Sequence, residues 1–113
     1  MNKLGPLKRK CDRLLQLKYV ALNPNCLICS NPTSEMHHFV PKSQSNYLRY
    51  DPRNLINLCR RCHARHHLSG DPSIVAEIIR IKGLEWYDSL NQDRLKIKKL
   101  NQGVLKELAQ ELG

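Results

Sequence analysis

The sequence has few aromatic residues, few acidic residues and no long apolar run. Phe, Trp and Tyr together make up 5% of the 113 residues, with a single Trp and a single Phe, so aromatic packing adds little to a core. We expect one domain, residues 1–113, that buries about two thirds of its unfolded surface and gains stability from a structural metal. No run approaches the roughly 20 apolar residues of a membrane span, so a membrane protein is not expected.

Acidic residues are outnumbered by basic ones. Ten Asp and Glu stand against 19 Lys and Arg, which gives a net charge of +9 at pH 7. A chain of this charge attracts polyanions, so the expected partner is DNA or RNA. The N-terminus has no apolar core followed by a small-residue cleavage site, so we expect a cytoplasmic protein.

Four of the five cysteines form two pairs with the spacing of metal ligands. Cys26 and Cys29 form one C-x-x-C motif, and Cys59 and Cys62 form the other. Two such turns supply the four thiolates of a structural Zn²⁺ site and leave no coordination position for water. Buried reduced cysteines and a redox pair are the alternatives. Cys11 stands apart and is expected to be a packed thiol on a helix face.

The chain divides into three segments. Residues 6–22 place Lys and Arg outside an apolar stripe, which predicts a basic amphipathic helix. Residues 26–70 hold the paired cysteines and all five histidines, and residues 71–113 have the pattern of a helical extension. Within the middle segment the predicted elements are a strand at 35–40, a strand at 54–58 and a helix at 60–68.

Helix signals mark the C-terminal extension. Asp71, followed by proline, predicts a helix start, and this helix should end before Gly83. From Leu84 to Leu112 a broken apolar stripe predicts two helices or one kinked helix, with interruptions at Asn91, Gln92 and Gly103. Its last part, from Ile97 to Leu112, could cover the core or form a homodimer interface. We favour the core, and both a monomer and a homodimer stay open.

The five histidines lie between the cysteine pairs or directly after them. His37 and His38 are adjacent on the first predicted strand, so their side chains should point to opposite faces and have separate roles. His63 and His67 are four residues apart on one face of the predicted helix, where both could reach one ion. His66 should point elsewhere and contact phosphate or solvent.

The order of these motifs resembles the HNH endonuclease motif in its four-cysteine form. The matching positions are C-x-x-C, His37-His38, Asn54-Leu55 and a second C-x-x-C followed by His63. The resemblance covers residues 26–67 and implies an α+β fold, with a ββα-metal core that carries two zinc knuckles between N- and C-terminal helices. It also implies a metal-dependent enzyme that hydrolyses the phosphodiester bonds of DNA.

The same resemblance implies roles for single residues. In the family pattern His38 is the general base, while His37 and His63 are ligands of a catalytic metal. Asn54 holds the loop that carries the base or helps to coordinate the metal, and His67 is an additional candidate ligand. The catalytic ion would be Mg²⁺, Mn²⁺, Ni²⁺ or Zn²⁺, because imidazole ligands alone do not determine its identity.

A basic cluster supports DNA, double-stranded or branched, as the partner. Between Met36 and Gly70 the single acidic residue is Asp51. The basic residues predicted to contact phosphates there are Lys42, Arg49, Arg53, Arg60, Arg61 and Arg65. Each phosphate that they neutralise would release counterions, so affinity should fall as salt rises.

A narrower resemblance, to the phage NinG (Rap) recombination endonuclease family, extends over residues 26–95. It rests on His38–Val40, Leu48–Asn54, Cys59–Cys62, Leu68–Asp71, Gly83 and Trp86–Leu90. It implies a phage or prophage nuclease in a bacterial cytoplasm that acts on branched or recombining DNA. The chain departs from that family at His37 and His63, where it is similar to other HNH enzymes.

Two other functions remain as alternatives. One is a non-catalytic, zinc-stabilised DNA-binding module, which has no need for His37, His38, Asn54 and His63 together. The other is a nuclease directed at RNA.

Overall fold

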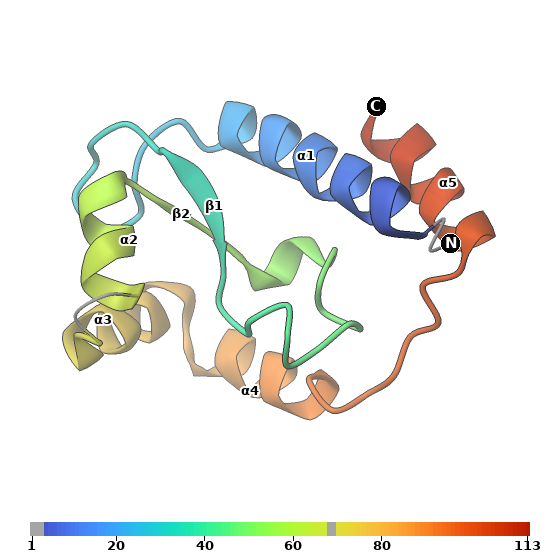
Figure 1. The fold of residues 1–113 in the computed structure, drawn as a ribbon. Coiled ribbons are helices and arrows are strands. Elements are labelled where there is room, and N and C mark those ends of the chain that lie inside the picture. The colour runs from blue at the N-terminus through green and yellow to red at the C-terminus, as the bar shows by residue number, and fades with distance from the viewer. Residues whose placement is uncertain (1–3, 68–69) are drawn as a thin grey trace.

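The computed structural model of the protein describes residues 4–67 and 70–113. The elements in chain order are α1 (Leu4–Leu22), β1 (Glu35–His38), the short 3₁₀ helix η1 (Pro52–Asn54), β2 (Leu55–Leu58), α2 (Arg60–His67), α3 (Pro72–Lys82), α4 (Leu84–Asp93) and α5 (Gln102–Leu112). Figure 1 shows the antiparallel sheet of β1 and β2 between two groups of helices, α1 with α5 on one side and α2 with α3 on the other. The predicted α+β class with helices at both ends is confirmed.

Strand β1 has a regular register with β2 and a polar clasp on its other edge. Glu35 pairs with Leu58 and His38 with Leu55, without a bulge, so His37 and His38 face opposite sides as expected. On the outer edge the Gln16 side chain of α1 takes the place of a neighbouring strand: its Oε1 accepts from the Met36 N–H at 2.7 Å, and its Nε2 donates to the Met36 carbonyl at 2.8 Å. This clasp fixes β1 against α1.

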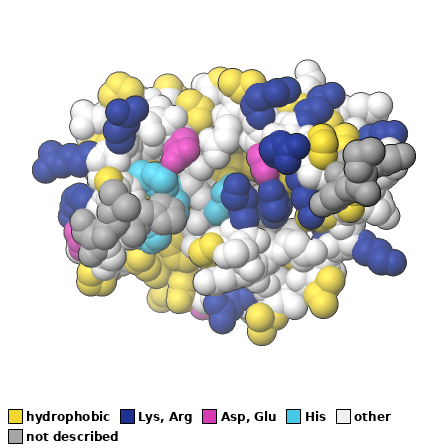
Figure 2. All heavy atoms as spheres, viewed as in Figure 1, with side chains coloured by type: hydrophobic (Ala, Val, Ile, Leu, Met, Phe, Trp, Pro, Cys, Tyr) yellow, Lys and Arg dark blue, Asp and Glu magenta, His cyan; other side chains and the backbone are white. Residues whose placement is uncertain are grey.

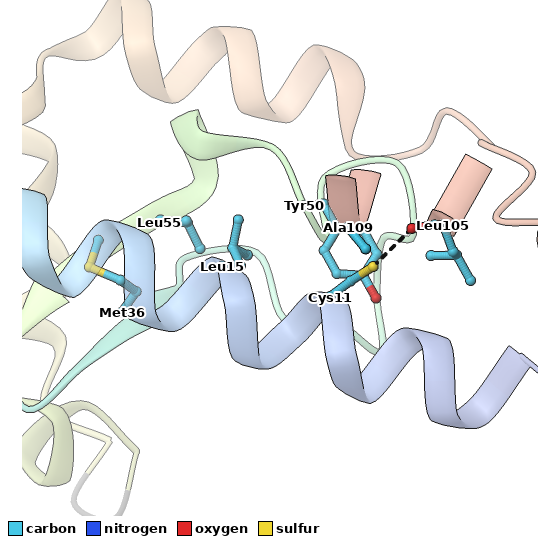
Figure 3. Packing of buried hydrophobic residues seen from close by; sticks show 7 residues of the cluster. All are labelled: Cys11, Leu15, Met36, Tyr50, Leu55, Leu105 and Ala109. Carbon is cyan, nitrogen blue, oxygen red and sulfur yellow. Dashed lines mark hydrogen bonds between the residues drawn. The ribbon is translucent and has the colours of Figure 1, made fainter. Parts of the chain in front are cut away.

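Helices α1 and α5 enclose an apolar cluster on the Met36 side of the sheet. Its buried members are Cys11, Leu15, Met36, Tyr50, Leu55, Leu105 and Ala109, which Figure 3 draws as sticks. The thiol of Cys11 is fully buried and donates to the Leu105 carbonyl at 3.3 Å, and burial raises the pKa of this thiol. Cys11 is therefore the packed thiol that the sequence predicted, and α5 covers the core.

The predicted helical stripe from Ile97 is wrong at its start, because the chain is not helical between Arg94 and Asn101. Ile97 itself is 88% exposed. The physical reason is a contact distant in sequence: the Asn46 amide donates to the Lys98 carbonyl at 2.5 Å and accepts from the Lys98 N–H at 3.3 Å. The next helix, α5, begins at Gln102, and the side chain of Asn101 caps it by accepting from the Val104 N–H. Another correction concerns the predicted interruptions at Asn91, Gln92 and Gly103, which all lie inside helices α4 or α5.

The sequence located the other helix ends closely. Asp71 caps α3 by accepting from the Ser73 N–H at 2.9 Å, and Gly83, with a φ of 97°, joins α3 to α4 in the left-handed region that favours glycine. Helix α1 begins at Leu4, two residues before the predicted start, and Pro6 fits within its first turn because no N–H donor is needed there. Among the described residues, no helix is long and apolar enough to cross a membrane.

Candidate zinc site and histidine pocket

The four paired cysteines come together at one point. Cys26 and Cys29 lie in the turn before β1, while Cys59 and Cys62 lie at the start of α2, and all four Sγ atoms are within 4.8 Å of one another. The Sγ atom of Cys29 is 3.5 Å from that of Cys59 and 3.7 Å from that of Cys62. Four sulfurs at about 2.3 Å from a tetrahedral Zn²⁺ would be about 3.8 Å apart, so the cluster has the size of a structural zinc site.

Backbone and apolar contacts hold this zinc site together. The turn of the first pair closes through the Ser30 N–H, which donates to the Cys26 carbonyl at 3.0 Å, and Ser30 adopts a left-handed φ of 66°. A second apolar cluster, with Ile56, Leu58, Ile74 and Ile78 among its members, packs around the cysteines. The zinc site therefore ties the start of the sheet to α2 and α3.

Within the cluster the thiols differ in how easily they ionise. Burial opposes ionisation of Cys59, but the Cys62 N–H at 3.4 Å and the neighbouring thiols donate to its sulfur and lower its pKa to about 7. Burial raises the pKa of Cys62, and the thiols around it add to this rise. A thiolate is thus favoured at Cys59, directly before the N-terminus of α2.

Three histidines line one pocket beside this site. The pocket has a volume of about 460 Å³, and its lining includes His37, His38, His63, Glu35 and Lys42. The ring of His37 is almost fully buried and lies 5.0 Å from the ring of His63, centroid to centroid. Nδ1 of His63 is 3.1 Å from Oε1 of Glu35. In Figure 2 histidine side chains reach the surface next to a group of Lys and Arg side chains near the middle of this face.

His38 is fixed by a backbone carbonyl. Its Nε2 lies 2.8 Å from the carbonyl oxygen of Arg49. A carbonyl can only accept a hydrogen bond, so Nε2 carries the proton and Nδ1 of the neutral ring keeps its lone pair. Burial lowers the pKa of His38, which favours this neutral form.

Asn54 lies at the base of the loop between the two strands and is fully buried. Its Oδ1 accepts from the Val40 N–H at 2.7 Å, and its Nδ2 donates to the carbonyls of Val40 at 2.9 Å and Leu48 at 3.3 Å. Its polar side-chain atoms are thus directed to the loop backbone. Of the two roles considered for Asn54, this geometry favours holding the loop.

The expected direction of His66 was wrong. Its ring lies 4.6 Å from that of His37, because residues three apart, such as His63 and His66, also share one side of a helix. His67 is the last residue of α2, and its proposed contact with a metal lies outside the residues whose side chains the structure describes.

Half of the basic residues predicted to bind DNA are held in ion pairs. Arg49 pairs with Asp12 at 2.7 Å and Arg65 with Asp71 at 2.8 Å, while Arg53 bridges Asp51 and Asp93 at 2.8 Å each. Three of these acidic partners, Asp12, Asp71 and Asp93, lie outside residues 36–70, the stretch in which Asp51 is the single acidic residue. The remaining Lys42, Arg60 and Arg61 are exposed, and no acidic group among the described residues pairs with them.

Three polar residues near the pocket were not singled out from the sequence. Gln16 clasps β1, Asp12 binds Arg49, and Glu35 contacts His63. Glu35 shares a strand face with His37, so the period of two along a strand could have indicated it. Asp12 and Gln16 lie in α1, and no local pattern connects them with the histidines.

Comparison with known proteins agrees with this geometry. Residues 26–68 match the family model of the HNH endonuclease, a stretch that contains the zinc cysteines, both strands and the whole of α2. The match supports a nuclease at the level of the family. Neither the curated proteins nor the solved structures contain a match to this chain.

Proposed function

We propose that the protein is a metal-dependent endonuclease that hydrolyses phosphodiester bonds of DNA at the histidine pocket. The observation that carries this proposal is His38, whose Nε2 is held by the Arg49 carbonyl and which lines one pocket with His37 and His63, although His37 and His38 leave β1 on opposite faces. A non-catalytic DNA-binding module would not need a half-buried imidazole with a fixed tautomer in a pocket that two further histidines line.

In this proposal His38 is the general base. Its neutral Nδ1 accepts a proton from water, and the resulting nucleophile attacks the phosphorus in line, without a covalent enzyme intermediate. The products are a 5′-phosphate and a 3′-hydroxyl. Asn54 acts as a positioning residue that keeps the loop, and with it the Arg49 carbonyl, in place against His38.

The donor set of the pocket fits a divalent ion. His37 and His63 bring two imidazoles to one pocket, and imidazole nitrogen suits Zn²⁺ and Ni²⁺, while substrate phosphate adds the oxygen ligands that Mg²⁺ and Mn²⁺ prefer. We assign His37, His63 and His67 as the residues that would hold this ion. When bound, it would neutralise the charge that develops on the phosphate during cleavage.

Basic residues that have no acidic partner in the described part of the chain are proposed to bind the DNA backbone. Lys42 lines the pocket, and Arg60 and Arg61 project from the first turn of α2. Basic side chains at a helix N-terminus interact unfavourably with the helix dipole, and a bound phosphate would offset this. Arg9 and Arg13 of α1 are exposed as well and are proposed to add to this basic surface.

Branched DNA is the substrate class that we propose within this activity. It follows from the resemblance of residues 26–95 to phage recombination endonucleases and would make the protein a phage or prophage nuclease. Cleavage of matched duplex, nicked, forked and four-way DNA by one preparation tests it. Equal rates on all four substrates would contradict a preference for branched DNA but would still support the nuclease activity.

The proposed activity is tested by nicking of supercoiled plasmid by purified protein with added Mg²⁺ or Mn²⁺. We expect relaxed product that EDTA abolishes. Retention of DNA on the protein with no nicking under any divalent ion would favour the non-catalytic binding module. Cleavage of RNA alone, with DNA left intact, would favour the RNA-directed nuclease.

A further inference from the structure

We propose that Asp12 of α1 is a positioning residue for His38, acting through Arg49. The inference rests on the proposed function in so far as it takes His38 to be the general base. It makes the N-terminal helix, which lies outside residues 26–68, a working part of the site.

Three groups form a continuous chain of contacts. The guanidinium of Arg49 donates twice to Asp12, from Nη2 to Oδ2 at 2.7 Å and from Nε to Oδ1 at 3.3 Å. The carbonyl of the same Arg49 accepts from Nε2 of His38 at 2.8 Å. Arg49 thus connects the Asp12 carboxylate, which its side chain contacts, with the His38 ring, which its backbone carbonyl contacts.

Asp12 has a fixed position from which to act. It follows Cys11, which is fully buried in the core between α1 and α5, so the register of the helix determines where its carboxylate lies. The side chains of Asp12 and Arg49 are only 22% and 20% exposed, which limits solvent screening of the pair. The two hydrogen bonds to Asp12 also fix the orientation of the guanidinium, which a single hydrogen bond would not do.

Two other side-chain contacts hold the residues on either side of Arg49, Leu48 and Tyr50. Asn54 donates to the Leu48 carbonyl at 3.3 Å, and the Tyr50 hydroxyl donates to the Lys8 carbonyl at 3.3 Å. Among the described residues, Asp12 makes the shortest side-chain hydrogen bond to residues 48–50, and its partner there is Arg49 itself. Rotation of the peptide after Arg49 would carry its carbonyl away from His38, and Asp12 opposes that rotation.

A different role for Arg49 predicts a different result. If Arg49 served to bind phosphate, Asp12 would compete with the DNA for it, and removal of the carboxylate would tighten DNA binding without slowing cleavage. If Asp12 positions His38, removal of the carboxylate slows cleavage at saturating DNA and changes affinity little. The split between rate and affinity therefore separates the two roles.

The test compares Asp12→Asn with Asp93→Asn. Asp93 is a matched control, because it is 18% exposed and pairs with an arginine, Arg53, at 2.8 Å, but that arginine does not contact His38. We expect Asp12→Asn to lower the single-turnover rate about tenfold, as loss of a partner that orients a catalytic group does, with DNA affinity within about twofold of wild type. Asp93→Asn should keep the wild-type rate.

A second readout does not depend on catalysis. Long-range ¹H–¹⁵N NMR spectra of the neutral imidazole distinguish a proton on Nε2 from one on Nδ1. We expect His38 to be the Nε2–H tautomer in the wild type and in Asp93→Asn, and a mixture of tautomers in Asp12→Asn. If Asp12→Asn does not fold, Arg49→Lys keeps the charge but loses the two-point contact, and it should show the same mixture with a smaller loss of rate.

Wild-type rate and an unchanged tautomer in Asp12→Asn, or in Arg49→Lys where that variant replaces it, would overturn the inference. So would tighter DNA binding with undiminished cleavage. If the wild-type protein does not cleave DNA at all, the proposed function fails, but the tautomer of His38 still decides whether Asp12 orients this ring.

Discussion

Asn54 and Val40 pair through both polar groups of the asparagine side chain. The Val40 N–H donates to Oδ1 at 2.7 Å, and Nδ2 donates to the Val40 carbonyl at 2.9 Å, in the manner of two adjacent strands. This pair closes the loop between β1 and β2 at its base. Because Asn54 is fully buried, water cannot replace it.

Replacement of Asn54 by Ala should therefore destabilise the protein. The buried N–H and carbonyl of Val40 would lose their partners, and we expect the free energy of unfolding to fall by about 3 kcal/mol. The control is Asn57→Ala, since Asn57 makes one exposed contact, to the Asn25 carbonyl. Urea denaturation measures both variants. Equal losses for the two would show that Asn54 has no special part in closing the loop.

Zinc binding should depend on the paired cysteines only. We expect about one Zn²⁺ per chain in the purified protein, and Cys59→Ser should lose most of this zinc and lower the thermal midpoint. Cys11→Ala should keep its zinc, because Cys11 lies in the separate core between α1 and α5. Elemental analysis and thermal denaturation of both variants provide the measurement. A folded wild-type protein without zinc would contradict the site.

The ion pairs divide the basic residues into two groups that should respond differently to salt. The triple change of Lys42, Arg60 and Arg61 to Ala should lower the slope of log affinity against log salt by about 2. Changing Arg53 and Arg65 to Ala should lower it by less than about half of that, because both are already neutralised by aspartates. A larger effect from the paired arginines would reverse this assignment and restore the grouping based on sequence alone.

The pH dependence of cleavage follows from the environment of His38. A general base works in its neutral form, and burial lowers the pKa of His38 from its ordinary value of 6.5. Neutral imidazole therefore persists to lower pH, and the rate should fall to half only below pH 6.5. A nearby cation would shift the pKa in the same direction. Single-turnover rates across mildly acidic and neutral pH give the midpoint, and a midpoint above 6.5 would argue against His38 as the base.

The sequence predicted those parts of the molecule that depend on local spacing. The two C-x-x-C motifs form tight turns whose sulfurs meet, and the adjacent His37 and His38 take opposite faces of a strand. The capped start of α3 at Asp71 and the packed thiol of Cys11 also follow from neighbouring residues. In each case the residues that matter are close in sequence or repeat with the period of one element.

Contacts between distant residues were not predictable in this way. Asp12 neutralises Arg49 from another helix, and Asn46 holds Lys98 extended where the apolar stripe indicated a helix. The wrong prediction for the direction of His66 has a different cause. Residues three apart and residues four apart both lie on one side of a helix, so His66 comes as close to His37 as His63 does. The sequence therefore indicated too many unpaired basic residues for DNA binding and too few histidines close to His37.

The measurement that tests the account most directly is the rate of single-turnover DNA cleavage by His38→Ala beside His63→Ala. His38→Ala should keep wild-type zinc content and DNA binding while its rate falls by roughly 10²- to 10⁴-fold, because the proton acceptor is removed. His63→Ala should lose activity through weaker binding of the catalytic ion, so higher Mg²⁺ or Mn²⁺ should restore part of its rate but not that of His38→Ala. Wild-type cleavage by His38→Ala, or rescue of that variant alone by added metal, would contradict the central claim that His38 is the general base of a metal-dependent nuclease.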